Sequence, residues 1–191
     1  MEIDKFIKIY DEDFKIERVA SLVKYASNKL KFKDAGTIGD GGGKKINIQK
    51  NIRNTEAYSL DVNDGSLSTV HWGHYVRRVI SNLFHKYNKE CSTEATVIAS
   101  VEILKYEKGG FYTIHSDHHA SIPRTLSVII FLNNDYEGGE LNFHDPITKE
   151  IYQTIEPSPG RCVIWPSNFI YPHSVSPVTK GTRYAIVSWL T

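Results

Sequence analysis

The feature that most constrains the fold is a succession of short apolar runs after Cys91. Each run is rich in β-branched or aromatic residues, and Gly, Pro, Asn or Asp separates it from the next. Runs of this length and composition are typical of the strands of an all-β sandwich or barrel. Residues 91–191 are therefore predicted to form a β-barrel core. The expected strands are ATVIASVEILKY, FYTIHSD, RTLSVIIFL, GELNF, RCVIW and RYAIVSW.

The part of the chain before this core predicts helices instead. Residues 13–30 and 68–89 place apolar side chains at helical spacings among Lys and Glu, which indicates two amphipathic helices. Residues 33–68 are rich in Gly, Asn, Asp and Ser. They are interpreted either as a mobile connector or as an active-site lid, because long loops in compact domains are often functional. Helices followed by strands predict an α+β fold in which helices buttress the barrel.

Composition limits the remaining choices. A length of 191 residues suits one domain over 1–191, with 1–90 as helical support and lid loop and 91–191 as the core. A formal net charge of +1 argues against nucleic acid as a partner. The acidic start and the lack of a long apolar run predict neither a secretory signal nor a membrane span. Cys91 and Cys162 show no paired spacing, which suits a reducing cytoplasm.

A His-x-Asp pair carries the chemistry. On a β-strand, residues two positions apart face the same way, so His115 and Asp117 would present an imidazole and a carboxylate side by side. A third ligand is expected from His173 at the edge of a later strand. Two His and one carboxylate form the facial triad of non-haem Fe(II) oxygenases. The alternative is a hydrogen-bonded pair within a strand, but metal-assisted oxidation is the leading hypothesis.

Arg183 adds a second signal. It begins the last predicted strand, where alternation places it on the same face as Ala185, Val187 and Trp189. If that face is the barrel interior, the guanidinium needs an anionic partner, because an unpaired interior charge is costly. A planar guanidinium can bind a carboxylate through two parallel hydrogen bonds. A dicarboxylic cosubstrate is therefore expected.

These segments together resemble a known family. Tyr106 to Asp117 fits the pattern Y-x-x-G-x-x-Y-x-x-H-x-D, and RTLSVIIFL, DYEGGELNF and PHSVSPVTKGTRYAIVSW follow it. They are similar to the Fe(II)- and 2-oxoglutarate-dependent dioxygenases of the prolyl 4-hydroxylase type. DYEGGEL and PVTKGTR are especially similar to the PKHD-type members of bacteria and phages. The resemblance covers about residues 95–191 and implies a double-stranded β-helix, or jelly-roll, core in a bacterial or phage-infected cytoplasm.

The resemblance also implies how the cofactors are held. His115, Asp117 and His173 would bind Fe(II), with ascorbate as reductant. Arg183 would bind the far carboxylate of 2-oxoglutarate, and the Tyr106 hydroxyl would donate to the same cosubstrate. A Thr that often follows Gly-Gly-Glu in the family also helps to hold this cosubstrate, but Leu141 stands there in this chain. Ser127 is expected to supply that hydroxyl instead.

The substrate is less constrained than the cofactors. By resemblance, Tyr112, Arg124 and Trp189 line the mouth of the site and contact the substrate. The first hypothesis is hydroxylation of a prolyl residue in a peptide or protein, with release of succinate and CO₂. The alternatives are a free amino acid or other small metabolite, and a catalytically silent binding module. A nucleobase demethylase and a cupin-like zinc or manganese enzyme fit the residues less well.

His118 and His119 are expected in a solvent-facing loop, and the oligomeric state stays open.

Overall fold

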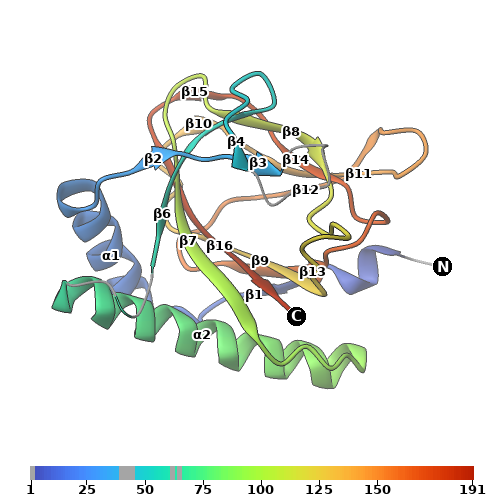
Figure 1. Ribbon diagram of the computed structural model, residues 1–191, viewed down its shortest axis with the longest axis horizontal. Coiled ribbons are helices and arrows are strands. Elements are labelled where there is room, and N and C mark those ends of the chain that lie inside the picture. The colour runs from blue at the N-terminus through green and yellow to red at the C-terminus, as the bar shows by residue number, and fades with distance from the viewer. Residues whose placement is uncertain (1–2, 39–45, 61–62, 64–65) are drawn as a thin grey trace.

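The computed structural model describes residues 3–38, 46–60, 63 and 66–191. Its strands form two facing antiparallel sheets, and the two long helices lie on the outer side of the larger sheet (Figure 1). The larger sheet has seven strands. In spatial order they are β1 (Lys8–Tyr10), β13 (Cys162–Pro166), β9 (Leu126–Phe131), β16 (Arg183–Leu190), β7 (Ile98–Tyr106), β6 (Glu56–Ser59) and β2 (Lys33–Asp34).

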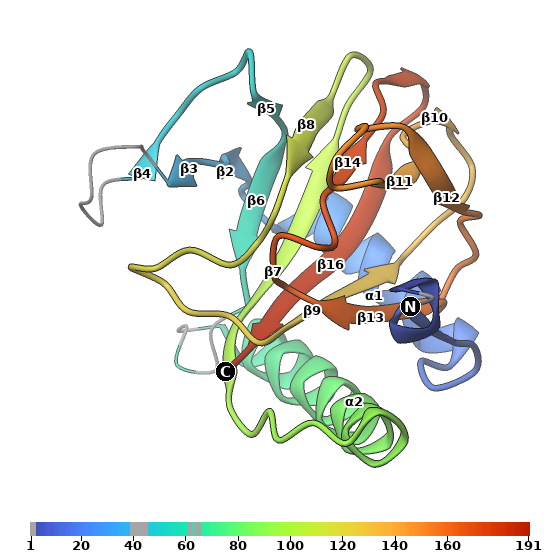
Figure 2. The same ribbon diagram turned by 90° about the vertical axis from the view of Figure 1, so that its right-hand side faces the viewer.

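The smaller sheet carries the residues that the sequence singles out as metal ligands. Its five strands are β12 (Ile151–Ile155), β11 (Leu141–His144), β14 (His173–Val175), β8 (Phe111–His115) and β5 (Arg53–Asn54). Two further strand pairs are β10 (Glu137–Gly138) with β15 (Val178–Lys180) and β3 (Thr37–Ile38) with β4 (Ile46–Asn47). Figure 2 shows β8 and β14 beside each other.

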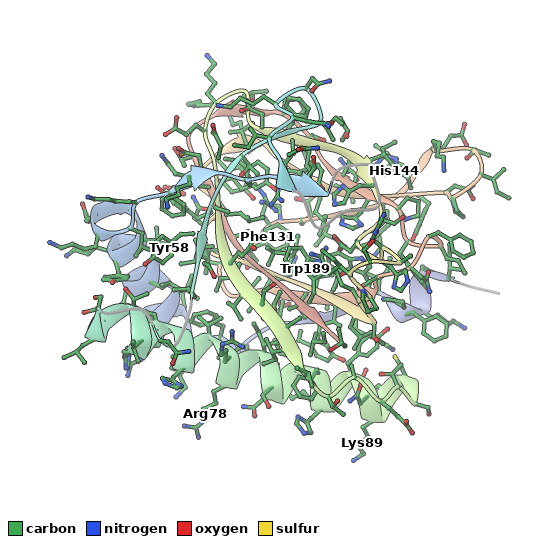
Figure 3. The ribbon with its side chains drawn as sticks, in the orientation of Figure 1. Tyr58, Arg78, Lys89, Phe131, His144 and Trp189 are labelled. Carbon is green, nitrogen blue, oxygen red and sulfur yellow. The ribbon has the colours of Figure 1, made fainter. Side chains whose placement is uncertain are left out.

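The space between the two sheets is filled by one hydrophobic cluster. It joins side chains of the larger sheet, such as Leu104 and Val187, to side chains of the smaller sheet, such as Phe143 and Val175. Figure 3 shows Phe131 pointing into this interior. Two antiparallel sheets packed over a common core form the sandwich expected of a jelly roll.

A second cluster lies between the larger sheet and the helices. On β16, Tyr184 and Ile186 face this cluster, whereas Ala185 and Val187 face the other sheet, as the two-residue period of a strand requires. The helices of this layer are α1 (Ile16–Lys29) and α2 (Leu67–Cys91), whereas Ile3 and Phe6 of the short helix η1 (Ile3–Phe6) pack against the cluster between the sheets. Along the outer face of α2, Arg78 and Lys89 point away from the sheet (Figure 3). Within the described ranges, no helix has both the length and the apolar character needed to span a membrane.

The predicted fold class is confirmed: the chain is α+β, with a jelly-roll core buttressed by N-terminal helices. The helices predicted at 13–30 and 68–89 form as α1 and α2. The described part of residues 33–68, which the sequence predicts to be a connector or an active-site lid, also contains strands that were not predicted. That segment supplies β2, β5 and β6, which extend the edges of both sheets. These strands are two to four residues long, which is too short to show an alternating pattern.

Candidate metal centre

The candidate metal ligands lie on two neighbouring strands of the smaller sheet. His115 on β8 and His173 on β14 are paired directly across the antiparallel register, and their ring centroids are 4.3 Å apart. Cross-strand partners on one face are neighbours, so the pairing itself brings two imidazoles together. Strand β8 ends at His115, yet Asp117 still turns its carboxylate towards both rings.

The three side chains surround one position. Asp117 Oδ1 lies 3.8 Å from His115 Nε2, and Asp117 Oδ2 lies 3.4 Å from His173 Nε2. One ligand atom from each residue lies within 4.8 Å of the other two. Two ligands about 2.1 Å from one ion and at right angles would be about 3 Å apart. The cluster is slightly wider than that and has the dimensions to hold one metal ion.

Both histidines are held in the tautomer that a metal requires. The Nδ1–H of His115 donates to the carbonyl oxygen of Thr113 at 2.8 Å, and that of His173 donates to the carbonyl oxygen of Tyr171 at 3.1 Å. The Nε2 lone pairs are thereby left facing Asp117. Such backbone partners orient metal-ligating histidines and fix their tautomer.

The protonation of the cluster also suits metal binding. Burial, helped by His173, lowers the pKa of His115 to about 3, so its imidazole is neutral at physiological pH. Burial alone would raise the pKa of Asp117. The neighbouring His173 and His115, together with a hydrogen bond from Ser127, instead hold it below its usual value. A neutral imidazole and an ionised carboxylate are the forms that ligate a metal.

Ser127 does not lie where its expected role requires. Its hydroxyl donates to Asp117 Oδ2 at 2.6 Å and also shares a hydrogen bond of 2.7 Å with the Ser167 hydroxyl. Ser127 lies four positions before Phe131 on β9, which is about 13 Å along an extended strand. Phe131 is the residue of β9 that packs against Arg183. Ser127 therefore orients the candidate metal ligand and is far from the guanidinium expected to bind the cosubstrate.

Arg183 is the second unusual side chain of the interior. It is 0% exposed, and its guanidinium lies 4.9 Å from the ring centroid of Tyr106 and 5.4 Å from that of Phe131. None of its three side-chain nitrogens makes a hydrogen bond within the described part of the chain. Tyr136 is a polar neighbour of this guanidinium: burial raises the pKa of the Tyr136 hydroxyl, and the charge of Arg183 and its closeness as a hydrogen-bond donor oppose that shift. A buried guanidinium without a partner predicts an anionic ligand.

Gly139 leaves the room that Arg183 needs. Its backbone φ is +68°, a conformation that favours glycine. A Cβ at this position would come within 3.0 Å of Arg183 Cδ and of Val178 Cγ2. Gly139 therefore shapes the space that the guanidinium occupies.

A small inner cavity of about 20 Å³ lies beside the metal ligands, and Tyr106, Trp165 and Trp189 are among its lining residues. The indole nitrogens of Trp165 and Trp189 are buried and make no hydrogen bond within the described residues. A cavity of this size holds about one water molecule. A dicarboxylic cosubstrate would therefore require these side chains to move apart when it enters.

A larger cavity of about 320 Å³ opens to the surface next to the metal ligands. Tyr112, Arg124 and Trp189, the expected substrate residues, all line it. The Tyr112 ring stacks on His115 at 3.5 Å between centroids, and the Arg124 guanidinium lies 3.7 Å from the Trp189 ring centroid. The structure thus brings the three residues to one opening, and their contact with substrate stays a prediction.

Three further residues line this cavity. His118 and His119 lie in the segment after β8, with His118 exposed and His119 half-buried, so the predicted loop borders the site. Arg53 also lines it and was missed, although it is 8% exposed and its guanidinium lies 4.9 Å from the Tyr112 ring centroid. A lone Arg in a polar segment carries no signal in the sequence.

Comparison with known proteins agrees with this geometry. Residues 101–191 match the family described as the 2OG-Fe(II) oxygenase superfamily. These residues belong to that superfamily. The matched range holds all three candidate metal ligands and Arg183, so the predicted family is confirmed.

The superfamily relatives are prolyl hydroxylases and PKHD-type hydroxylases. Human prolyl 3-hydroxylase 2 is 38% identical over 68 residues, which are 36% of this chain and 10% of the relative. A PKHD-type hydroxylase of Synechococcus sp. is 33% identical over 102 residues, which are 49% of this chain and 43% of the relative. The chain thus spans less than half the length of these curated relatives.

Two solved oxygenase structures show the same fold over nearly the whole chain. A Pseudomonas putida prolyl 4-hydroxylase has a TM-score of 0.73 at 18% identity, covering 97% of this chain and 92% of its own. A Trichoplax adhaerens prolyl hydroxylase, solved with a hypoxia-inducible factor peptide fragment, has a TM-score of 0.71 at 18% identity, covering 97% and 83%. The helices and sheet edges outside the matched family range therefore also belong to this architecture.

Proposed function

We propose that this oxygenase is an Fe(II)- and 2-oxoglutarate-dependent hydroxylase of a prolyl residue in a peptide or protein, releasing succinate and CO₂. The observation that carries the proposal is the wholly buried guanidinium of Arg183, which has no counter-ion among the described residues and lies in the same interior as the His115–Asp117–His173 cluster. A metal site alone fits many enzymes. A metal site with a buried cation that lacks a counter-ion fits an enzyme that also binds a dicarboxylate.

Each cofactor has residues that fit it. His115, Asp117 and His173 would hold the iron, because two imidazoles and one carboxylate are the donor set of non-haem Fe(II) oxygenases. Arg183 would bind the far carboxylate of 2-oxoglutarate through two parallel hydrogen bonds. Tyr106 is paired with Arg183 across β7 and β16, and its hydroxyl would donate to the same molecule. When bound, the two cofactors supply the oxidising power that hydroxylates an unactivated C–H bond.

The chain contributes orientation and a dry interior. Ser127 and the carbonyl groups of Thr113 and Tyr171 hold the ligands in place through hydrogen bonds. On the inner side, the ring of Trp165 lies 5.0 Å and the ring of Phe143 5.9 Å from the ring of His173. These apolar walls exclude water from the side of the cluster opposite the surface opening.

A peptide or protein substrate fits the position of the larger cavity. It opens at the surface and is walled by two aromatic side chains and an arginine, Tyr112, Trp189 and Arg124. Such a mouth suits a side chain that enters from an extended peptide. The names of the relatives support the same choice, because prolyl hydroxylases recur among them.

The test is succinate formation by the purified protein with Fe(II), ascorbate and 2-oxoglutarate under air, with and without a pool of proline-rich peptides. Peptide-stimulated succinate together with the mass of one added oxygen atom on a peptide is the expected result. Slow succinate that no peptide stimulates would overturn the peptide substrate and favour a small metabolite. No succinate under any condition would overturn the enzyme assignment itself.

A matched pair of variants checks that the cluster is responsible. His173→Ala should abolish both metal binding and succinate formation. His144→Ala is the control, because His144 is buried to the same degree on the adjacent strand but its ring bonds to Ser174 and lies outside the cluster. Wild-type succinate formation by His173→Ala would contradict the metal assignment.

A further inference from the structure

We propose that Arg53 and Arg124 form an anion-binding subsite at the larger cavity and select a substrate that carries a carboxylate close to the target C–H bond. The proposal rests on the proposed function, because it names the chemistry of the substrate for the same site. Arg53 belongs to the segment before the barrel core, so this segment would contact the substrate directly and contribute to specificity.

Strand β5 places Arg53 at the site. Arg53 pairs with Tyr112 across the register of β5 and β8, so the two side chains lie on the same face of the smaller sheet. The guanidinium lies over the Tyr112 ring, and its Nη1 donates to the carbonyl oxygen of Gly36 at 3.0 Å. Its Nε is buried and has no hydrogen-bond partner in the described ranges. A buried donor without a partner points to a ligand that the cavity receives.

Arg124 comes to the same cavity from the start of the segment that leads into β9. Its guanidinium lies over the Trp189 ring, and its Nη1 donates to the backbone oxygen of Asp117 at 3.2 Å. Nη1 is also 3.8 Å from Asp117 Oδ1. Contact with aromatic faces holds both guanidinium groups in place, which reduces the entropy lost when a ligand binds.

The charges around the cavity favour an anion. Asp117 is the sole acidic residue among the described residues that line it, and a bound metal ion would take up that carboxylate. Glu102 acts on Arg124 electrostatically but does not line the cavity. The formal charges in the interior sum to zero when a divalent metal (+2), Asp117 (−1), 2-oxoglutarate (−2) and Arg183 (+1) are counted. The positive charges of Arg53 and Arg124 are therefore not neutralised by these groups and are available to bind an anionic substrate.

A carboxylate near the target can come from two sources. It can be an Asp or Glu side chain beside the hydroxylated residue of a peptide, or the α-carboxylate of a free amino acid or a chain end. The cavity of about 320 Å³ is near the lower end of ligand-site volumes and accommodates either group beside the metal. Both sources offer the planar, bidentate acceptor that a guanidinium binds best.

The test compares matched probes by equilibrium binding and by turnover. Short fluorescent peptides Ala-Glu-Pro-Ala and Ala-Gln-Pro-Ala, amidated at the C-terminus, differ only in the charge beside proline. Free L-proline and prolinamide test the α-carboxylate as competitors. Binding is measured by anisotropy under nitrogen, with the protein loaded with Mn(II) and 2-oxoglutarate, so that the result does not depend on turnover. Succinate formation under air with Fe(II) is measured separately.

The expected result is at least a tenfold lower Kd for a carboxylate probe than for its amide counterpart. Preference within the peptide pair identifies an acidic peptide, and preference within the proline pair identifies an α-carboxylate. Arg53→Gln should remove the preference, and Arg53→Lys should retain part of it because the charge remains. If Arg53 only packed against Tyr112, the Arg53→Gln and Arg53→Lys variants would show the same preference for carboxylate over amide probes. Arg78→Gln on the exposed face of α2 should match the wild type.

Equal binding of carboxylate and amide probes, or a preference that survives Arg53→Gln, would overturn the anion subsite. Failure to bind any of the probes would overturn it as well. These outcomes are distinct from failure of the proposed function. In that case carboxylate preference would persist in the binding assay while no succinate formed with Fe(II), ascorbate and 2-oxoglutarate.

Discussion

Removal of the Ser127 hydroxyl gives the sharpest test of how the metal ligands are held. Ser127 is fully buried and donates to the ionised carboxylate of Asp117 at 2.6 Å. Hydrogen bonds to charged groups contribute about 1.5–3 kcal/mol, and loss of a partner behind a metal ligand typically lowers metal affinity by about 10- to 100-fold. Ser127→Ala should therefore raise the Kd for Mn(II) or Fe(II) by about 10- to 100-fold, measured by anaerobic isothermal titration calorimetry.

Ser188→Ala provides the matched control. Ser188 is equally buried in the same sheet, and its hydroxyl donates to the backbone oxygen of Ser100 at 2.6 Å. This variant should lose about 1 kcal/mol of unfolding free energy, as is typical for a neutral hydrogen bond, and keep its metal affinity. An unchanged metal Kd in Ser127→Ala would refute the inference that Ser127 orients the ligand.

Three other predictions concern buried residues of the protein interior. Arg183→Met should raise the free energy of unfolding of the ligand-free protein by about 1 kcal/mol or more, because it removes a buried charge that has no counter-ion among the described residues, and should abolish thermal stabilisation by 2-oxoglutarate. A retained ligand-induced Tm shift would contradict this. Gly139→Ala should displace Arg183 and raise the Kd for 2-oxoglutarate several-fold with metal affinity unchanged, and an equal Kd in calorimetry would contradict it. Cys162 should resist iodoacetamide, because burial raises the pKa of its thiol, whereas half-buried Cys91 should react. Equal labelling by mass spectrometry would contradict this.

The residues that sequence reasoning predicted are those that lie in patterned segments. His115 and Asp117 form a recognisable pair, and Arg183 lies on a long strand whose alternation shows which face is interior. The structure confirms that interior face, because Ala185 and Val187 pack in the cluster between the sheets. The two helices were likewise predictable, because each has a long apolar stripe.

The residues that were missed or misplaced depend on contacts between distant segments. Arg53 lies in a strand of two residues, for which the sequence has no periodicity, and it reaches the site only because β5 pairs with β8. The position of Ser127 on β9 was predicted, but its partner could not be. That partner, Asp117, lies beyond the end of β8, and its direction is set by the turn that follows the strand.

The register between β8 and β14 also bears on how the protein reaches its native state. His115 and His173 face each other across two strands of five and three residues, with an irregularity directly after His173. A shift of one residue would turn one imidazole to the opposite side of the sheet. A divalent ion binds only the arrangement in which both imidazoles and Asp117 converge, and by mass action it adds its binding free energy to that arrangement alone. Metal present during refolding should therefore favour the native register of β8 and β14 and increase the yield of correctly folded chains.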